Sequence, residues 1–325
     1  MPQVSVVIPL HNPGAYIREA IQSVQDQTFK DFELILIDDA STEDLSWIEQ
    51  QFPDVRMIRQ MHGGVSVARN NGILNSCGDY VAFMDQDDMW APTKLERQVE
   101  CLNSDDTIGV CYCELQLVDK YGKAISPEDD AVEQSANGPK YFVELGGEEN
   151  QSTEFSRMHQ AISYFSTRFV VPSTVMLRKR CLSVSGLLDP FIPFSGDFDL
   201  IIKLGSNFKI ARIPGSEVYY RRHDKNFSLQ YEVCKQEVEQ LISKYSKYAA
   251  QHGDLVLARE ARKLFTVPSK IYAAQAFDRC RQSVRERDVK SSLRHFLKAF
   301  SSDPLYVSTS IAKWMSLRIP VNQSH

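Results

Sequence analysis

The sequence predicts an α/β protein with a mainly parallel sheet, followed by a region that is entirely helical. Between Val4 and about Glu114, short β-branched runs alternate with stretches whose apolar residues recur at helical spacing, as in consecutive βαβ units. Beyond Tyr231 only the helical spacing continues. With 325 residues, 43% of them hydrophobic, the chain can bury one large core. We therefore expect an α/β domain over residues 1–230 and a C-terminal helical region over residues 231–325.

Four strands and three crossover helices are expected in the first half of the α/β domain. The helical spacing is clear where Ile17, Ile21 and Val24 fall on one face. The strands are predicted over residues 4–8, 32–38, 55–58 and 80–84, and the helices over residues 16–25, 44–51 and 65–76.

A change of composition interrupts this pattern. Residues 119–160 contain Pro127, an acidic run at 128–130 and the adjacent Gly146 and Gly147, which are typical of loops, so we expect a loop-rich insertion there. After it, strands are predicted over residues 173–179, 208–213 and 217–221, and a helix over residues 197–204. The C-terminal region is predicted to hold one helix from residue 231 to the stop at Gly253, and further helices over residues 255–265, 269–287 and 289–300.

Charge, cysteine content and hydropathy argue against several classes of protein. The net charge of -5 and the pI near 5.9 give no basic surface for nucleic acid. The seven cysteines contain no CxxC pair and are expected to be reduced. The sequence has neither a secretory signal nor a run of eighteen apolar residues, so we expect a cytoplasmic protein. Residues 306–320, which mix Trp314 with Lys313 and Arg318, predict either peripheral contact with the inner membrane face or a packed terminal helix.

Three carboxylates follow a predicted buried strand in YVAFMDQDDMW, namely Asp85, Asp87 and Asp88. Ligands bind parallel sheets beyond the C-terminal ends of the strands. Neighbouring carboxylates raise one another's pKa, and a divalent cation relieves that repulsion. Mn²⁺ or Mg²⁺ held by such carboxylates also binds phosphate oxygens. We predict a metal-assisted nucleotide site here, with an ordinary surface turn as the alternative.

A second strand, in LILIDDASTED, ends at Asp38 and Asp39. A carboxylate at this place can accept a hydrogen bond from a nucleobase N–H or a ribose hydroxyl. The alternative is that it starts a turn or caps the next helix. We expect both roles in this pair.

Five motifs occur in one order: VSVVIPLHN, QDQTFKDFELILIDDAST, GGVSVARNNGI, GDYVAFMDQDD and GDFDLIIKLG. Together they resemble the family 2 glycosyltransferases over residues 1–230, and the whole set is more specific than any single motif. The resemblance implies a GT-A fold, which is Rossmann-like, a nucleotide-sugar donor and transfer with inversion. It does not cover the C-terminal helices.

The resemblance also implies roles for five residues, matched by their positions in these motifs. Pro9, Asp39 and Arg69 would line the nucleobase site. Asp85 would hold the ribose, and Asp87 would hold the divalent cation, Mn²⁺ or Mg²⁺.

The resemblance places the general base in SGDFDL, where Asp197 is the matching residue. Such a base takes the proton of the acceptor hydroxyl as it attacks the face opposite the leaving diphosphate. Gly196 stands where the family usually has the Glu of a Glu-Asp pair. Asp199 is the alternative base, although helix spacing points it elsewhere. After the next strand, in YYRRHDKNFS, His223 is the candidate for contact with the metal or the diphosphate.

These features predict an inverting transferase that moves a sugar from a nucleotide-diphosphate-sugar donor, of the UDP or dTDP type, to a glycan or glycolipid hydroxyl in cell-surface polysaccharide or glycoconjugate synthesis. A nucleotidyltransferase of the same fold would need a basic loop after the first strand, where PLHNPGAY has no Lys or Arg. Another alternative is a nucleotide-sugar-binding scaffold without transfer activity that acts through its helical tail. The sugar and the acceptor would be selected by residues 119–160 and 191–195.

Overall fold

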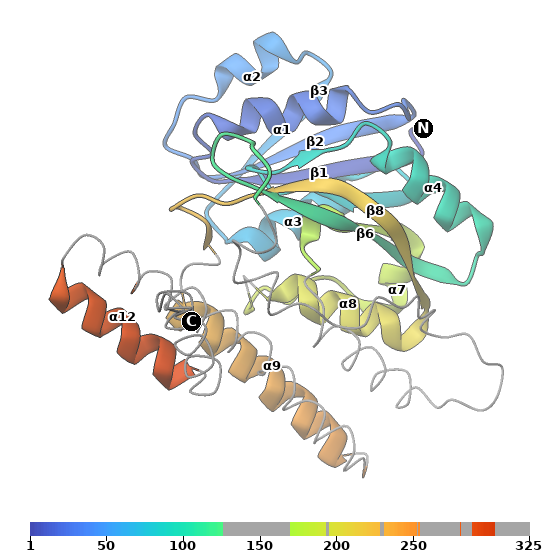
Figure 1. Cartoon of the computed structure of the whole chain (residues 1–325). Helices are drawn as coiled ribbons and strands as arrows, with labels where there is room; N and C mark the ends of the chain where they lie inside the picture. Colours follow the sequence, from blue (N-terminus) through green and yellow to red (C-terminus); the bar gives the residue numbers. More distant parts are fainter. Residues whose placement is uncertain are drawn as a thin grey trace, which may run out of the picture.

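The computed structural model describes residues 1–125, 170–192, 195–227, 231–251, 253, 280 and 288–302. Within these residues, eight strands form one sheet in the order β3-β2-β1-β4-β7-β6-β8-β5 (Figure 1). The strands β1 (Val4–Leu10), β2 (Phe32–Asp39), β3 (Val55–Gln60) and β4 (Tyr80–Phe83) run parallel to their neighbours in this group. The predicted α/β class with a mostly parallel sheet is confirmed.

The other half of the sheet mixes strand directions. Strand β7 (Val175–Arg178) is antiparallel to both β4 and β6 (Ile108–Val118). Strand β8 (Lys209–Arg221) is parallel to β6 and antiparallel to the short β5 (Met89–Trp90).

Two predictions in this half need correction. The two strands predicted over residues 208–213 and 217–221 form one strand, because the pairing with β6 shifts its register near Glu114 and continues. The strand predicted from residue 173 begins only at Val175. The residues before it form the 3-10 turn η1 (Pro172–Thr174), which the Thr174 hydroxyl stabilises by donating to the Val171 carbonyl at 2.7 Å.

Side chains alternate along the strands and so divide the core into two layers. Val4, Val6 and Ile8 pack against the apolar faces of three helices, α1 (Tyr16–Gln25), α2 (Ser46–Gln51) and α4 (Lys94–Ser104). Val7 and Ile35 face the other way, toward α3 (Val65–Asn75), α7 (Leu182–Ser185) and α8 (Gly196–Asn207). Figure 1 shows α1 and α2 on one side of the sheet and α3, α7 and α8 on the other.

Two helices of the C-terminal region are described, α9 (Tyr231–Gln251) and α12 (Val289–Ser302). Leu241, Tyr245 and Ala249 of α9 pack against Ile202 of α8, and the predicted stop at Gly253 has the left-handed φ of 74°. Asp288 accepts a hydrogen bond from the Ser291 N–H at 3.0 Å at the start of α12.

Several predicted segments lie outside the described residues. They are most of the insertion over 119–160, the helices over 255–265 and 269–287, and the segment over 306–320. Among the helices that the structure describes, none is long and apolar enough to cross a membrane.

Candidate active site

The C-terminal ends of β1, β2 and β4 meet at one edge of the sheet because the three strands are parallel. Asp39 is the last residue of β2, and Asp85 follows the end of β4 by two residues. Pro9 lies in β1 opposite Ile37, beyond the last pairing of β1 with β4. The missing N–H of Pro9 therefore removes no hydrogen bond between β1 and β4. Three residues predicted to bind the nucleotide thus share this edge.

Asp39 is buried and holds the loop that leads into α3. The backbone N–H groups of Gly63 and Gly64 donate to its two carboxylate oxygens at 2.7 and 2.9 Å. The Gln60 side chain donates at 2.8 Å, and His62 Nδ1 lies 3.0 Å from Oδ2. Burial acts to raise the pKa of Asp39, but these hydrogen bonds and the His62 charge outweigh it and lower the pKa. Asp39 is therefore a stable carboxylate at neutral pH.

The neighbouring Asp38 has the turn-forming role that was expected of one member of the pair. It is 2% exposed, and its carboxylate accepts the Ser41 N–H at 2.8 Å. Within this turn, Ala40 adopts a left-handed φ of 60°, which is uncommon for a residue with a Cβ. Asp38 and Asp39 are consecutive residues of β2, so their side chains point to opposite faces of the sheet.

Arg69 is buried and joins α3 to the end of β4. Its Nη2 donates to Asp85 Oδ1 at 2.6 Å, while its buried Nε has no hydrogen-bond partner within the described structure. The helix can approach the sheet closely because a Cβ at Gly72 would overlap the Val7 side chain. Arg69 is therefore fixed at the sheet edge.

Asp87 and His223 are 136 residues apart in the sequence and lie in contact in the structure. His223 Nε2 lies 2.8 Å from Asp87 Oδ2, and the His223 ring stacks on Tyr16 with centroids 4.9 Å apart. The Lys225 N–H lies 3.2 Å from His223 Nδ1. Since a backbone N–H can only donate, Nδ1 accepts this bond and Nε2 carries the proton that points at Asp87.

Asp88 is occupied by the protein itself. One of its oxygens accepts the Ser173 hydroxyl, and the other accepts the Arg221 N–H at 3.1 Å. Arg221 is 1% exposed, and its Nε donates to the Asp87 carbonyl at 3.0 Å. Asp88 and Arg221 therefore fix the Asp87 backbone, while the Asp87 carboxylate remains partly exposed.

The residues of this cluster fit a hard divalent cation. Burial, together with the charges of the neighbouring aspartates, raises the pKa of Asp88 well above its usual value. Burial also raises the pKa of Asp85, although Arg69 opposes the shift. A cation beside Asp87 would relieve this repulsion, and carboxylate oxygens suit Mg²⁺ and Mn²⁺. Asp87 and His223 are the pair that could hold it.

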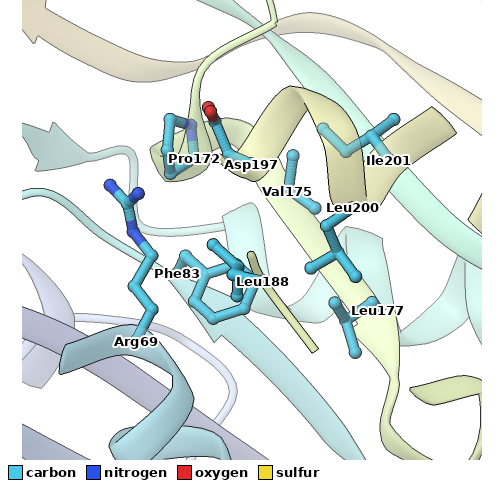
Figure 2. A pocket seen from close by; sticks show the side chains of 9 residues that line it. All are labelled: Arg69, Phe83, Pro172, Val175, Leu177, Leu188, Asp197, Leu200 and Ile201. Atoms are coloured by element: carbon cyan, nitrogen blue, oxygen red, sulfur yellow. The ribbon is translucent and has the colours of Figure 1, made fainter. Parts of the chain in front are cut away.

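Asp197 lies in a small pocket whose other walls are largely apolar. Figure 2 shows the Asp197 carboxylate and the Arg69 guanidinium on the same side of this pocket, above Phe83 and Leu188. Burial raises the pKa of Asp197 to about 6, and the Asp85 charge adds to the shift, while Arg69 and the Phe198 N–H oppose it. The carboxyl group is thus tuned toward the pH range in which a general base works best.

Gly196, which replaces the usual Glu of the family motif, has a steric reason. A Cβ at this position would lie 2.5 Å from the Ser66 hydroxyl of α3, and that hydroxyl donates to the Ile192 carbonyl at 3.1 Å. The start of α8 can therefore approach α3 only because residue 196 has no side chain. This close approach brings Asp197 and Arg69 to one pocket.

Asp199 points away from the pocket, as helix spacing predicted. It is fully buried and accepts hydrogen bonds from Lys244 Nζ at 2.8 and 2.9 Å and from the Tyr245 hydroxyl at 2.9 Å. Lys203 lies 3.2 Å from the same carboxylate. Four residues before Asp199, the Ser195 N–H donates to Glu237 of α9 at 2.7 Å. Helix α9 therefore anchors the helix that carries Asp197.

Sequence reasoning missed several contributors to this site. Ser173, Tyr16, Asn226 and Glu237 carry no motif of their own, and Tyr16 could be assigned only to the start of a helix. The contacts that show their role come from residues that lie 42 to 207 positions away along the chain.

Comparisons with known proteins give a consistent result. A family model described as Glycosyl transferase family 2 matches residues 5–182. An uncharacterized glycosyltransferase of Nostoc sp. is 36% identical over 148 residues, which cover 44% of this chain and 44% of that relative. The match thus spans less than half of the relative's length.

Solved structures share the fold. The structure of S. aureus TarS 1-349 in complex with UDP-GlcNAc has a TM-score of 0.51 at 16% identity, covering 91% of this chain and 90% of that one. Mannosyltransferase PcManGT from Pyrobaculum calidifontis, in complex with GDP-Man and Mn²⁺, has a TM-score of 0.55 at 14% identity, covering 98% and 88%. The predicted GT-A fold is confirmed by these similarities.

Proposed function

Because this chain belongs to glycosyl transferase family 2, we propose that it transfers a sugar from a nucleotide-diphosphate-sugar to an acceptor hydroxyl, with inversion at the anomeric carbon. The observation that carries the proposal is the pocket shared by Asp197 and Arg69, next to the aspartates at the end of β4. A base and a cation site at one sheet edge are the two elements that such a transfer requires.

Asp197 acts as the general base in this proposal. With its pKa raised to about 6, it is ionised at neutral pH and accepts a proton more readily than an ordinary aspartate. The acceptor oxygen forms its bond to the anomeric carbon as its proton passes to Asp197. The bond from that carbon to the diphosphate breaks on the opposite side, and its electron pair leaves with the diphosphate.

The donor nucleotide is proposed to bind along the edge formed by Pro9, Asp39, Arg69 and Asp85. Both oxygens of Asp39 already accept two contacts, which is the usual capacity of a carboxylate oxygen. A nucleobase N–H would therefore replace the side chain of Gln60 or His62, while the glycine N–H bonds remain. A UDP-type donor is proposed, and TarS was solved with UDP-GlcNAc.

Asp87 and His223 are proposed to hold Mn²⁺ or Mg²⁺, which would neutralise the leaving diphosphate. Support comes from their 2.8 Å contact and from PcManGT, whose structure contains Mn²⁺. Asp85 is held by Arg69 and is proposed to accept the ribose hydroxyls. The acceptor is proposed to be a glycan or glycolipid hydroxyl, reached by a cytoplasmic protein at the inner membrane face.

Calorimetric titration with UDP and Mn²⁺, combined with slow hydrolysis of UDP-sugars, tests this function. We expect Asp87→Ala to lose the Mn²⁺-dependent part of UDP binding. Asp197→Asn should retain UDP binding and lower transfer by about a hundredfold or more once an acceptor is found, as losses of a general base do. If the wild-type protein binds UDP but consumes no UDP-sugar with water or glycan acceptors, the scaffold alternative is supported instead.

A further inference from the structure

Three side chains around Asp39 form a second cluster of metal-ligating groups, separate from Asp87 and His223. One ligating atom each of His11, Asp39 and His62 lies within 4.8 Å of the others. The two imidazole rings lie side by side, with centroids 4.7 Å apart. His11 comes from the turn after β1, and His62 comes from the loop before α3.

The hydrogen bonds of the cluster indicate the tautomer of the His11 ring. His11 Nδ1 lies 2.8 Å from the Asp39 carbonyl, which can only accept. Asn12 Nδ2, which can only donate, lies 3.3 Å from His11 Nε2. His11 therefore carries its proton on Nδ1 and a lone pair on Nε2. Metal-binding histidines commonly have this arrangement, with the second ring nitrogen donating to a backbone carbonyl.

His62 contributes a nitrogen already at ligand spacing from the carboxylate. Its Nδ1 lies 3.0 Å from Asp39 Oδ2, close to the edge of about 3.3 Å that zinc–ligand bonds of about 2.0 Å give in a tetrahedron. His62 is 63% exposed while Asp39 is 4% exposed. The carboxylate is thus rigid, and the exposed rings can rotate to close the set.

We propose that His11, His62 and Asp39 form a binding site for a nitrogen-preferring transition-metal ion such as Zn²⁺, at the nucleobase end of the donor site. The ion would replace the proton shared by His62 and Asp39 and take its remaining ligands from water. Two imidazoles and one carboxylate favour Zn²⁺ over Mg²⁺, which prefers oxygen ligands. This site is therefore chemically distinct from the oxygen-rich cluster at Asp87.

One consequence rests on the proposed function. Asp39 and His62 stand where the nucleobase is proposed to bind, so a bound ion and a donor nucleotide exclude each other. By linkage, Zn²⁺ must weaken UDP binding by the same factor by which UDP weakens Zn²⁺ binding. Transition-metal ions would then inhibit the protein by a route that does not involve the Asp87 site.

The test is calorimetric titration of the full chain with Zn²⁺ alone, in an Asp87→Ala background that removes the other proposed metal site. We expect one Zn²⁺ site, which His62→Gln or His11→Gln weakens by about tenfold or more. His223→Gln is the control and should leave this affinity unchanged. The proposal is overturned if the Asp87→Ala protein binds no Zn²⁺ or if both histidine variants bind it as tightly as the background does.

A second titration separates this proposal from the proposed function. If the Asp87→Ala protein still binds UDP, saturating UDP should weaken its Zn²⁺ binding. If the variant no longer binds UDP, the same titration is carried out on the wild-type protein. Zn²⁺ binding that depends on His62 but is insensitive to bound UDP would keep the metal site and overturn its placement at the nucleobase end. Loss of Zn²⁺ binding with intact UDP binding would overturn the metal site alone.

Discussion

Replacing Asp197 by Asn removes the charge of the proposed base and keeps its shape, so it tests how the pocket sets the pKa. Burial raises the pKa of Asp197 from 3.8 to about 6. A pKa unit corresponds to about 1.4 kcal/mol, so the ionised group destabilises the folded protein by at most about 3 kcal/mol. Because the side chain keeps partial exposure, we expect a value of about 1 to 3 kcal/mol.

The pH dependence of this stability difference follows from the direction in which the pKa of Asp197 is shifted. A carboxyl group whose pKa is higher in the folded protein favours folding most below pH 3.8, and this contribution is lost as the pH rises through about 6. Asn does not titrate. The stability of Asp197→Asn relative to wild type should therefore increase between about pH 4 and pH 6 and stay constant above that.

Urea unfolding of both proteins at several pH values measures this difference directly. The reasoning is refuted if Asp197→Asn is less stable than wild type at pH 8, or if the difference does not change with pH. Asp199→Asn is a matched control two residues along the same helix. It should cost about 1 to 3 kcal/mol, because it removes the buried carboxylate that accepts from Lys244, Lys203 and the Tyr245 hydroxyl, while both lysines are partly exposed.

Three further outcomes are expected. Turnover should rise with pH through about 6, the pKa of Asp197, because the proposed base must be ionised. The residual activity of Asp197→Asn should not show this rise. A wild-type turnover that is constant between pH 5 and 8 would contradict the prediction. Gly196→Ala should cost about 1 to 3 kcal/mol through overlap with Ser66, and Ser66→Ala should recover much of that loss in the double variant; no recovery would refute the steric account. A protein of residues 1–230 should lose turnover more than UDP affinity, which a kinetic comparison with the full chain checks, and an unaltered turnover would show that α9 is dispensable.

The fold up to β4 was predictable because local sequence and tertiary packing agree there, whereas β5, α4 and β6 were not predicted. The helix expected over residues 16–25 has the same bounds in the structure, since its apolar face and its packing surface on the sheet coincide. The second half was less predictable. The bulge that keeps β8 continuous and the turn before β7 depend on pairing with β6 and on the Thr174 hydroxyl, and neither is visible in local periodicity.

The candidate site was likewise only partly predictable from the sequence. Aspartates that end a strand, such as Asp39 and Asp85, were predictable because strand ends locate ligand sites in parallel sheets. What each carboxylate contacts was not predictable. Whether Asp87 or Asp88 remains open to a cation depends on Ser173 and Arg221, which come from distant elements. The assignments of Asp197 and of the nucleotide and metal ligands stay predictions until the variants are measured.

The contacts around α8 connect the helical region to the chemistry. The start of this helix is held on one side by α3, through the close approach of Gly196 to Ser66, and on the other by α9, through Glu237 and the buried Asp199. A carboxylate that must meet an acceptor hydroxyl within hydrogen-bond distance depends on such support, because a displacement of about 1 Å can cost a hundredfold in rate. The proposed nucleotide edge is built from β1, β2, β4 and α3. Helix α3 thus serves both donor binding and proton transfer, whereas α9 supports the helix that carries Asp197. Changes in α9 should therefore affect proton transfer more than donor binding.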